Sequence, residues 1–252
     1  MKKILITGGA GNIGQKAAAH LSANYALTLI DRRECEGVVE ADLSQWGVWS
    51  ETFEGIDTVV HLAANPHPGA SWAELLEPNI DTVMNVYEAS ARAGVRRLVF
   101  ASSNHAMGGY MDRLEPGKLT TELTPLPGTP QEKDGISDAP GYGTTKLIGE
   151  RLGKWYSEMH GLSFIALRIG WVRREENLAS DLPTDQGGWL PEMWLSNRDL
   201  CQIIEKCIEA PDSVRFAVLN AMSANNGMAW DIEHTQRVIG YQPMDGRGSD
   251  AC

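Results

Sequence analysis

The sequence is poor in several features that would place it in other protein classes. None of its apolar runs approaches the roughly 18 residues that a transmembrane helix needs. Its four cysteines, Cys35, Cys201, Cys207 and Cys252, do not have the spacing of a zinc site, so we expect a reduced protein without metal. Lys and Arg number 22 against 33 Asp and Glu, and the resulting net charge of −11 argues against a nucleic-acid partner.

The beginning of the chain also lacks a signal-peptide pattern. Two lysines precede an apolar run, Ile4–Ile6, that soon reaches glycines, whereas a signal peptide has a longer apolar core. We therefore interpret the run as a buried strand and expect a cytoplasmic protein with no membrane partner. The 252 residues suit one large domain, and no repeat or low-complexity linker divides them. We predict a single domain over 1–252, with segments at about 108–140 and 171–252 covering a substrate.

Apolar runs and amphipathic stretches alternate along the chain. The expected strands are Lys3–Ile6, Ala26–Ile30, Val38–Val39, Thr58–His61, Arg97–Ser102, Ser163–Arg168 and Phe216–Leu219. The expected helices are Ile13–Leu21, Ile80–Ala93, Tyr142–His160, Asn197–Ala210 and Trp230–Ile239. This alternation predicts an α/β fold with a doubly wound parallel sheet. Surface loops are expected at Gly108–Pro140 and Arg173–Pro191, and a frayed tail after Gln242.

A glycine-rich turn lies between the first expected strand and the first expected helix. In Thr7–Gly14, Gly8 allows a tight turn, Gly11 allows the backbone to approach a pyrophosphate, and Gly14 allows close helix packing. The helix that begins at Asn12 and Ile13 offers free N–H groups and a positive dipole end to the phosphates. The position of the turn, at the start of an alternating pattern, predicts a nicotinamide dinucleotide as cofactor.

Acidic residues at the ends of the next two strands bear on which dinucleotide is bound. Asp31 ends the second strand, where a carboxylate can accept both ribose hydroxyls and repel a 2′-phosphate, which favours NAD. Arg32 and Arg33 follow it and are suited to a 2′-phosphate, so NADP is the less favoured alternative. Asp42 follows the third strand and is predicted either to reach the adenine amino group or to be a solvated turn residue.

Tyr142 and Lys146 lie one helical turn apart on the same face of a predicted helix. A cation beside a phenol lowers the pKa of the phenol, which can then exchange a proton with an alcohol near neutral pH. Ser103 follows the strand before the long loop, where ligands of open parallel sheets bind. Ser103 is predicted either to donate a hydrogen bond to the substrate oxygen or to cap the strand end. His105 is either a substrate ligand or a loop histidine.

Together these residues resemble the extended short-chain dehydrogenases/reductases, the group of NAD-dependent epimerases and dehydratases. The resemblance rests on the glycine turn, Asp31, Asp42, His61-Leu62-Ala63-Ala64, Asn79, Ser103 and Tyr142-x-x-x-Lys146, and covers about residues 1–240. It implies a Rossmann-type sheet with a small C-terminal substrate-binding portion. It implies Tyr142 as the catalytic acid/base, Lys146 on the nicotinamide ribose and Ser103 orienting the substrate. The expected cofactor contacts are Gly8, Gly11, Asn12, Ile13, Gly14, Asp31, Arg32, Asp42, Leu43, Leu62, Ala63, Ala64, Asn79, Tyr142, Lys146 and Ile169.

Within this group the chain is most similar to uronate dehydrogenases and related sugar or sugar-6-phosphate 1-dehydrogenases. The similarity lies in Ser102–His105, Leu167–Gly170, Met193–Ser196 and Ser223–Asn226. It implies oxidation of the anomeric hydroxyl of a sugar or 6-anionic sugar to a lactone, with substrate contacts from Ser103, Asn104, His105 and Trp171. Trp171 stands where uronate dehydrogenases have serine. Trp189 stands near the position of their carboxylate-binding arginine. Arg173 or Arg174 in the neighbouring loop either replaces that arginine or is a solvated surface residue.

Two other functions compete with a sugar dehydrogenase. The first is an epimerase or dehydratase that reduces and reoxidises its cofactor in one turnover; only about 80 residues follow Arg168, which is short for binding a nucleotide-sugar. The second is a nucleotide-sensing protein without catalysis, against which the catalytic residues argue. The family resemblance also implies a homo-oligomer, paired through Ile80–Ala93 and Tyr142–His160.

Overall fold

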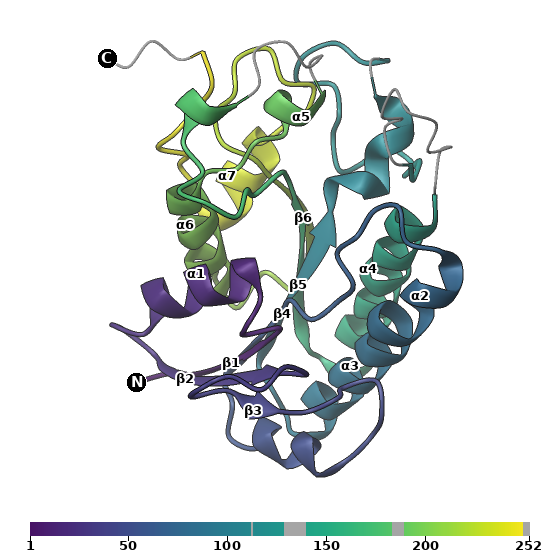
Figure 1. Ribbon diagram of the computed structural model, residues 1–252, viewed down its shortest axis with the longest axis vertical. Coiled ribbons are helices and arrows are strands. Elements are labelled where there is room, and N and C mark those ends of the chain that lie inside the picture. Colours follow the sequence, from purple (N-terminus) through teal and green to yellow (C-terminus); the bar gives the residue numbers. More distant parts are fainter. Residues whose placement is uncertain (112, 129–139, 183–188, 249–252) are drawn as a thin grey trace.

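The computed structural model describes residues 1–111, 113–128, 140–182 and 189–248, and its centre is a seven-stranded parallel sheet (Figure 1). The order of the strands across the sheet is β3-β2-β1-β4-β5-β6-β7. The order reverses between β1 and β4, the place where open parallel sheets bind their ligands. The strands are β1 (Lys3–Thr7), β2 (Ala26–Asp31), β3 (Val39–Glu40), β4 (Thr58–His61), β5 (Arg97–Ser103), β6 (Ser163–Ile169) and β7 (Phe216–Ala221).

Helices cover both faces of the sheet, because each crossover between parallel strands returns over one face. One face carries α1 (Asn12–Leu21), α6 (Asn197–Ile208) and α7 (Glu233–Ile239), whose apolar residues form a single cluster with those of the strands. The other face carries the 3₁₀ helix Val48–Phe53, α3 (Thr82–Arg92) and α4 (Gly141–His160). The predicted Rossmann-type fold is therefore confirmed.

A third apolar cluster lies apart from the two faces of the sheet. It joins the 3₁₀ helix Asn104–Tyr110, the short helix α5 (Trp189–Glu192) and the chain after β7. The core of this cluster contains Met107, Trp189, Met193, Met222 and Trp230, and Trp171 packs against it. Of these segments, α5 and the chain after β7 belong to the region 171–252 that was predicted to cover the substrate.

Several predicted elements differ from the observed ones. The helix predicted at Ile80–Ala93 is a π-helical turn, Glu77–Asp81, followed by α3, and the helix predicted from Trp230 begins at Glu233. Helix α2 (Trp72–Leu76) was not predicted, although Ser71 and Glu74 form a capping box at its start. Part of the predicted loop Gly108–Pro140, at 129–139, lies outside the described residues.

The prediction of a frayed tail after Gln242 is wrong for residues 243–248. The backbone N–H groups of Met244 and Asp245 donate to the carboxylate of Asp199, which is fully buried. Ser223 Oγ also donates to this carboxylate, at 2.6 Å. Asp199 therefore ties the tail to the start of α6, which sequence periodicity cannot show.

Within the described ranges, no helix is both long and apolar enough to cross a membrane.

Candidate active site

The turn between β1 and α1 has the backbone geometry of a phosphate cradle. Gly8 has a φ of 71°, and a Cβ placed there would lie 2.8 Å from Ala63 N. A Cβ at Gly14 would overlap the carbonyl oxygen of Gly8. The N-cap position of α1 is Gly11, which leaves the first-turn N–H groups of Asn12 and Ile13 to a ligand. The turn therefore fits the pyrophosphate of a dinucleotide.

Asp31, at the end of β2, is buried beside this turn. Its Oδ2 accepts a hydrogen bond from Ala10 N at 3.0 Å, and Arg33 Nε donates to its Oδ1 at 3.2 Å. Burial alone would raise the pKa of this carboxyl, but the hydrogen bonds from Arg33 and Ala10 hold the pKa below its usual value. Asp31 is thus an ionised acceptor where the adenosine ribose of a dinucleotide would lie. Arg32 beside it is exposed.

The residues after β3 and β4 include further predicted cofactor contacts. Asp42 is exposed, and its Oδ1 accepts hydrogen bonds from the N–H and the hydroxyl of Ser44. Leu43 is buried in the core. The segment Leu62–Ala64 is half-buried, and Thr7 Oγ1 accepts hydrogen bonds from Leu62 N and Ala63 N at 3.2 Å. Thr7 therefore fixes the predicted cofactor-lining segment against β1.

The side chain of Asn12 makes hydrogen bonds that the sequence did not predict. Its amide nitrogen donates to the carbonyl oxygens of Val172 and Arg173, at 3.4 and 3.3 Å. Lys16, one turn further along α1, donates to Asn12 Oδ1 at 2.8 Å and to Arg173 O at 2.6 Å. The first turns of the predicted cofactor helix thus hold the chain that leaves β6 just after Trp171.

Ser103, Tyr142 and Lys146 come together between the end of β5 and the start of α4. All three are buried, and Ser103 hydrogen-bonds the side chain of Tyr142. Lys146 Nζ lies 5.6 Å from the centre of the Tyr142 ring and 5.3 Å from that of Phe100. The three residues therefore form one constellation, as the sequence predicted.

Burial dominates the acid–base properties of this constellation. It raises the pKa of Tyr142 to about 12, although the hydrogen bond from Ser103 lowers it. It lowers the pKa of Lys146 to about 8. Below pH 8, Lys146 is mainly a cation near a neutral phenol. Transfer of a proton to Tyr142 requires its phenolate, and a protonated Lys146 favours that form.

Asn104 and His105 follow Ser103 directly. The amide nitrogen of Asn104 donates to Ile169 O at 2.9 Å, so this side chain joins the ends of β5 and β6. The imidazole of His105 contacts the Tyr142 ring edge to face, with the ring centres 5.6 Å apart. Its Nδ1 lies 3.2 Å from Gly128 O, and burial lowers the pKa of the ring. A neutral ring that donates from Nδ1 keeps an acceptor at Nε2 for a substrate hydroxyl.

Asn79 lies in the π-helical turn, with its side chain buried. Its Nδ2 donates to Asn65 O and to Thr145 Oγ1, and its Oδ1 accepts from Asn65 N at 2.7 Å. This network ties the loop after β4 to α4 between Tyr142 and Lys146. The sequence predicted Asn79 as a cofactor residue but gave no sign of these partners.

Two tryptophans, Trp171 and Trp189, lie at the third apolar cluster, which we call the far side of the site. Trp171 pairs through its backbone with Met193 O and Leu195 N, and Arg173 lies over its ring at 5.8 Å. Trp189 is buried in the third apolar cluster, with its ring centre 4.5 Å from that of Trp230. Arg173 donates to Asp181 O at 2.9 Å and lies within ion-pair distance of Glu175 and Asp181. Arg173 thus already has a hydrogen-bond partner and two acidic neighbours within its own loop.

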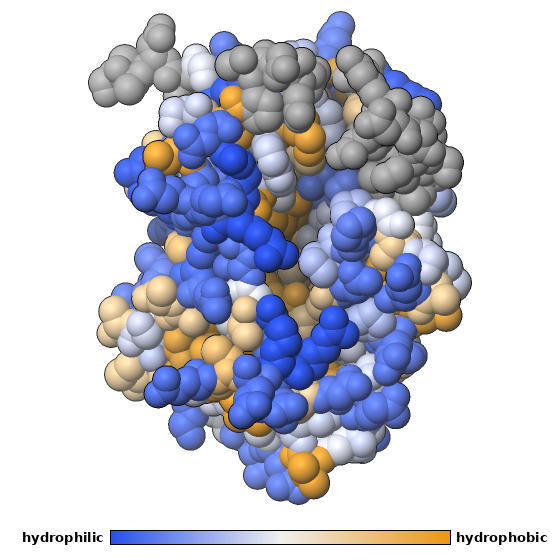
Figure 2. All heavy atoms as spheres, in the orientation of Figure 1, coloured by the Kyte–Doolittle hydropathy of each residue, from blue (hydrophilic) through white to orange (hydrophobic). Residues whose placement is uncertain are grey.

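The predicted residues gather at one edge of the sheet, because they follow the carboxyl ends of β1 to β6. Figure 2 shows a hollow running down the molecule between the side that carries α1 and α6 and the side that carries α2 and α4. Hydrophobic residues are visible deep within it. A groove of this kind suits a ligand that buries its apolar parts.

Comparison with known proteins gives a consistent set of relatives. Residues 4–172 match the model of the NAD dependent epimerase/dehydratase family. The chain is 38% identical to L-arabinose 1-dehydrogenase (NAD(P)(+)) of Haloferax volcanii, over 97% of each protein. It is 32% identical to the NAD-dependent glucose-6-phosphate dehydrogenase of the same organism, over 96% of this chain and 93% of that protein.

The matching solved structures include two dehydrogenases of sugar acids. A mutant uronate dehydrogenase from Agrobacterium tumefaciens, complexed with NAD, superposes with a TM-score of 0.78 at 28% identity, covering 98% of this chain and 86% of that one. Glucuronic acid dehydrogenase from Chromohalobacter salexigens superposes with a TM-score of 0.79 at 26% identity, with the same coverage.

Proposed function

This chain belongs to the NAD-dependent epimerase/dehydratase family, and from that premise we propose that it oxidises the anomeric hydroxyl of a free, neutral aldose to a lactone. The observation that carries the proposal is the joining of Ser103, Tyr142 and Lys146 beside the glycine cradle. The relatives named above are sugar dehydrogenases that match nearly the whole chain, which supports an NAD-dependent sugar dehydrogenase.

Each side chain of the site has a separate role in the proposed reaction. The glycine turn and Asp31 would hold NAD, which would supply the acceptor for the hydride of the anomeric carbon. Ser103 donates a hydrogen bond to the anomeric oxygen and holds it near Tyr142. The phenolate of Tyr142 removes the hydroxyl proton as the C–O bond becomes the lactone carbonyl, and protonated Lys146 stabilises that phenolate. His105, through Nε2, accepts a hydrogen bond from a neighbouring sugar hydroxyl.

A substrate without a charge at carbon 6 fits the far side of the site best. A sugar carboxylate or phosphate needs a charged hydrogen-bond partner in a buried site. Trp189 is 5% exposed among apolar residues, and Arg173 is engaged by its own loop. The relative named as an L-arabinose 1-dehydrogenase also supports a neutral aldose.

The test is a panel of L-arabinose, D-xylose, D-glucose, D-glucuronate and glucose 6-phosphate, assayed for net NADH formation. We expect kcat/KM for a neutral aldose to exceed that for both anionic sugars by about 10-fold or more, the value of a charged hydrogen bond that is missing. Parallel assays with NADP should give lower kcat/KM, because the ionised Asp31 repels a 2′-phosphate. A faster reaction with an anionic sugar would contradict the neutral substrate. No NADH from any sugar, with cofactor tightly retained, would instead indicate an epimerase or dehydratase.

We also infer that the chain forms a homodimer through α3 and α4. Ile148, Trp155 and Met159 form an exposed stripe along α4, and Met84 is exposed on the neighbouring α3. Large apolar side chains gathered on two adjacent helices are typical of an interface.

Light scattering after size exclusion tests this inference. We expect the wild type to be a dimer and Trp155→Glu to be a monomer, because the new carboxylate would be buried without a partner. Val48→Glu places the same change on a residue that is 83% exposed on a different element, and should remain dimeric. A wild type that is monomeric at assay concentration would refute the inference.

A further inference from the structure

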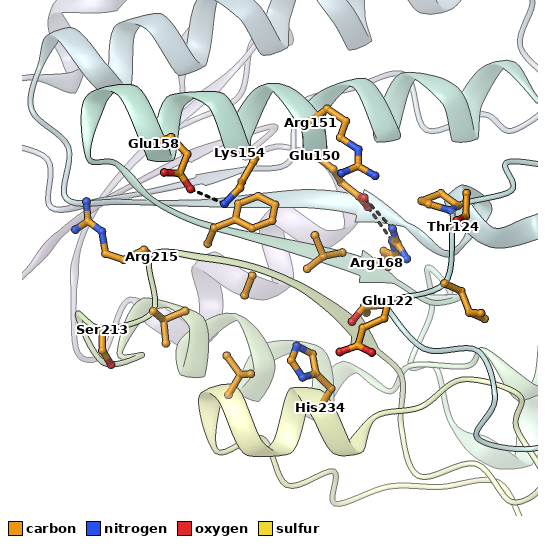
Figure 3. Close-up of a pocket in the computed structure, with 18 residues that line it drawn as sticks. Glu122, Thr124, Glu150, Arg151, Lys154, Glu158, Arg168, Ser213, Arg215 and His234 are labelled. Carbon is orange, nitrogen blue, oxygen red and sulfur yellow. Dashed lines mark hydrogen bonds and ion pairs between the residues drawn. The ribbon is translucent and has the colours of Figure 1, made fainter.

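A buried ion pair lies directly behind the catalytic constellation. Arg168 on β6 donates to both carboxylate oxygens of Glu150 on α4, each at 2.9 Å. Ser102 Oγ donates to the same carboxylate at 2.6 Å. All three residues are at most 3% exposed. Figure 3 shows the pair on the wall of a cavity of about 740 Å³ between α4, β7 and α7, with Glu150 reaching from the helix to Arg168.

The position of this network relates it to the reaction. Ser102 precedes Ser103 on β5, and in the sheet Ser102 pairs with Arg168 while Ser103 pairs with Ile169. Glu150 lies one helical turn after Lys146, which lies one turn after Tyr142. The three-way bond therefore joins the strand that carries Ser103 to the helix that carries the other two catalytic residues.

Most other contacts between α4 and the central strands β5 and β6 are apolar packing. Further hydrogen bonds of α4 go to α3, to the π-helical turn and to the chain before β7. Gly149 and Gly153 bring the helix onto the ring faces of Phe100 and Phe164, so close that a Cβ on either glycine would overlap a ring. Flat apolar contacts of this kind are non-directional. A bidentate ion pair with a further hydroxyl bond has a defined direction and geometry.

Stability alone is a poor explanation for the pair. Removing two charges from water costs about as much as their attraction returns, and apolar residues of similar volume often stabilise a fold equally well. Neither Glu150 nor Arg168 is a cause of the pKa shifts of Tyr142 and Lys146, which come mainly from burial. The remaining role for the ion pair is to fix the position of α4 relative to β5.

We propose that Ser102, Glu150 and Arg168 are positioning residues that set the distance between Ser103 and Tyr142. This proposal rests on the proposed function, since it assigns a role in that reaction. Displacement of a reacting group by 1 Å can cost about 100-fold in rate, so a small axial shift of α4 is enough to matter.

Ser102→Ala tests the proposal, because it cuts the link to β5 and leaves the ion pair intact. We expect kcat to fall about 10- to 100-fold, with NAD affinity within about twofold of the wild type. Loss of the Ser103 hydrogen bond would raise the pKa of Tyr142, so the rising limb of the pH–rate profile should move to higher pH. Ser102→Thr keeps the hydroxyl and should restore both the rate and the profile.

Ser90→Ala is the matched control. Ser90 is also fully buried, and its hydroxyl donates to Val86 O at 2.7 Å within α3, away from the site. It should lower the melting temperature like Ser102→Ala but leave kcat and the pH profile unchanged. If Ser102→Ala behaves like this control, the network is only structural and the proposal is wrong.

A crystal structure of Ser102→Ala gives a readout that does not depend on turnover. We expect the distance between Ser103 Oγ and Tyr142 Oη to lengthen beyond hydrogen-bond range. An unchanged distance overturns the positioning role even if the sugar panel fails. A lengthened distance supports it even if the reaction proves to be an epimerisation.

Discussion

Tyr142→Phe is expected to lower kcat by about 10²- to 10⁴-fold, the usual contribution of a positioned acid or base. The change removes the phenol oxygen that hydrogen-bonds Ser103 and would receive the proton of the sugar. The ring itself is buried against His105 and near Lys146, so phenylalanine should keep the packing. Initial rates of NADH formation measure the loss, and NAD titration should give an affinity close to that of the wild type.

Tyr156→Phe is the control on the same helix. Tyr156 is also buried, and its hydroxyl donates to Glu88 at 2.9 Å, three turns away from the site. Its removal should leave kcat within about twofold, since the group lies far from the proposed reacting atoms. If Tyr142→Phe turns over sugar at the rate of Tyr156→Phe, Tyr142 is not the base and the proposed mechanism is wrong.

The parts of the site that were predictable from the sequence depend on local patterns. Gly8, Gly11 and Gly14 act through their own backbone, and Tyr142 and Lys146 share a face because a helix repeats every 3.6 residues. Asp31 and Ser103 end strands that their apolar runs already outlined. These features need no knowledge of which distant segment lies nearby, so sequence spacing alone places them.

The parts that were not predictable depend on contacts between distant segments. Nothing in the sequence indicates that the side chain of Asn12 holds the carbonyl oxygens of Val172 and Arg173. Nothing near Asn79 in the sequence identifies Thr145 as a partner. The polar identity of such residues can be read directly, but their partners are set by how the loops cross the edge of the sheet.

Trp171 and Trp189 are a third case, because the sequence identified them as departures from the uronate dehydrogenase pattern but did not explain them. Trp189 was singled out because it lacks the charge of an arginine, and the apolar cluster around it explains the difference. A charged side chain there would be buried among Met193, Met222 and Trp230 with a large desolvation cost. The same packing argues against a charged group on the substrate at this end.

Gly14→Ala is expected to weaken NAD binding by about 100-fold or more, because it displaces the backbone on which the pyrophosphate would lie. A Cβ on Gly14 would overlap Gly8 O and lie 2.9 Å from Gly9 Cα. Both contacts are with backbone, which cannot rotate away as a side chain can, so the turn or the helix must shift. Overpacking of this kind also costs about 1–3 kcal/mol of stability.

Affinity and folding must be measured separately for this variant. Calorimetric titration with NAD measures the affinity that depends on the glycine turn. The melting temperature without cofactor measures the stability of the fold. Gly47→Ala is the control, because its Cβ would make an ordinary contact of 3.5 Å with Trp49 and should change neither quantity appreciably. A Gly14→Ala protein that is folded and binds NAD as tightly as the Gly47→Ala protein would show that the pyrophosphate lies elsewhere. A folded protein with affinity lost and Tyr142 still hydrogen-bonded to Ser103 would separate the cofactor end of the site from its catalytic end.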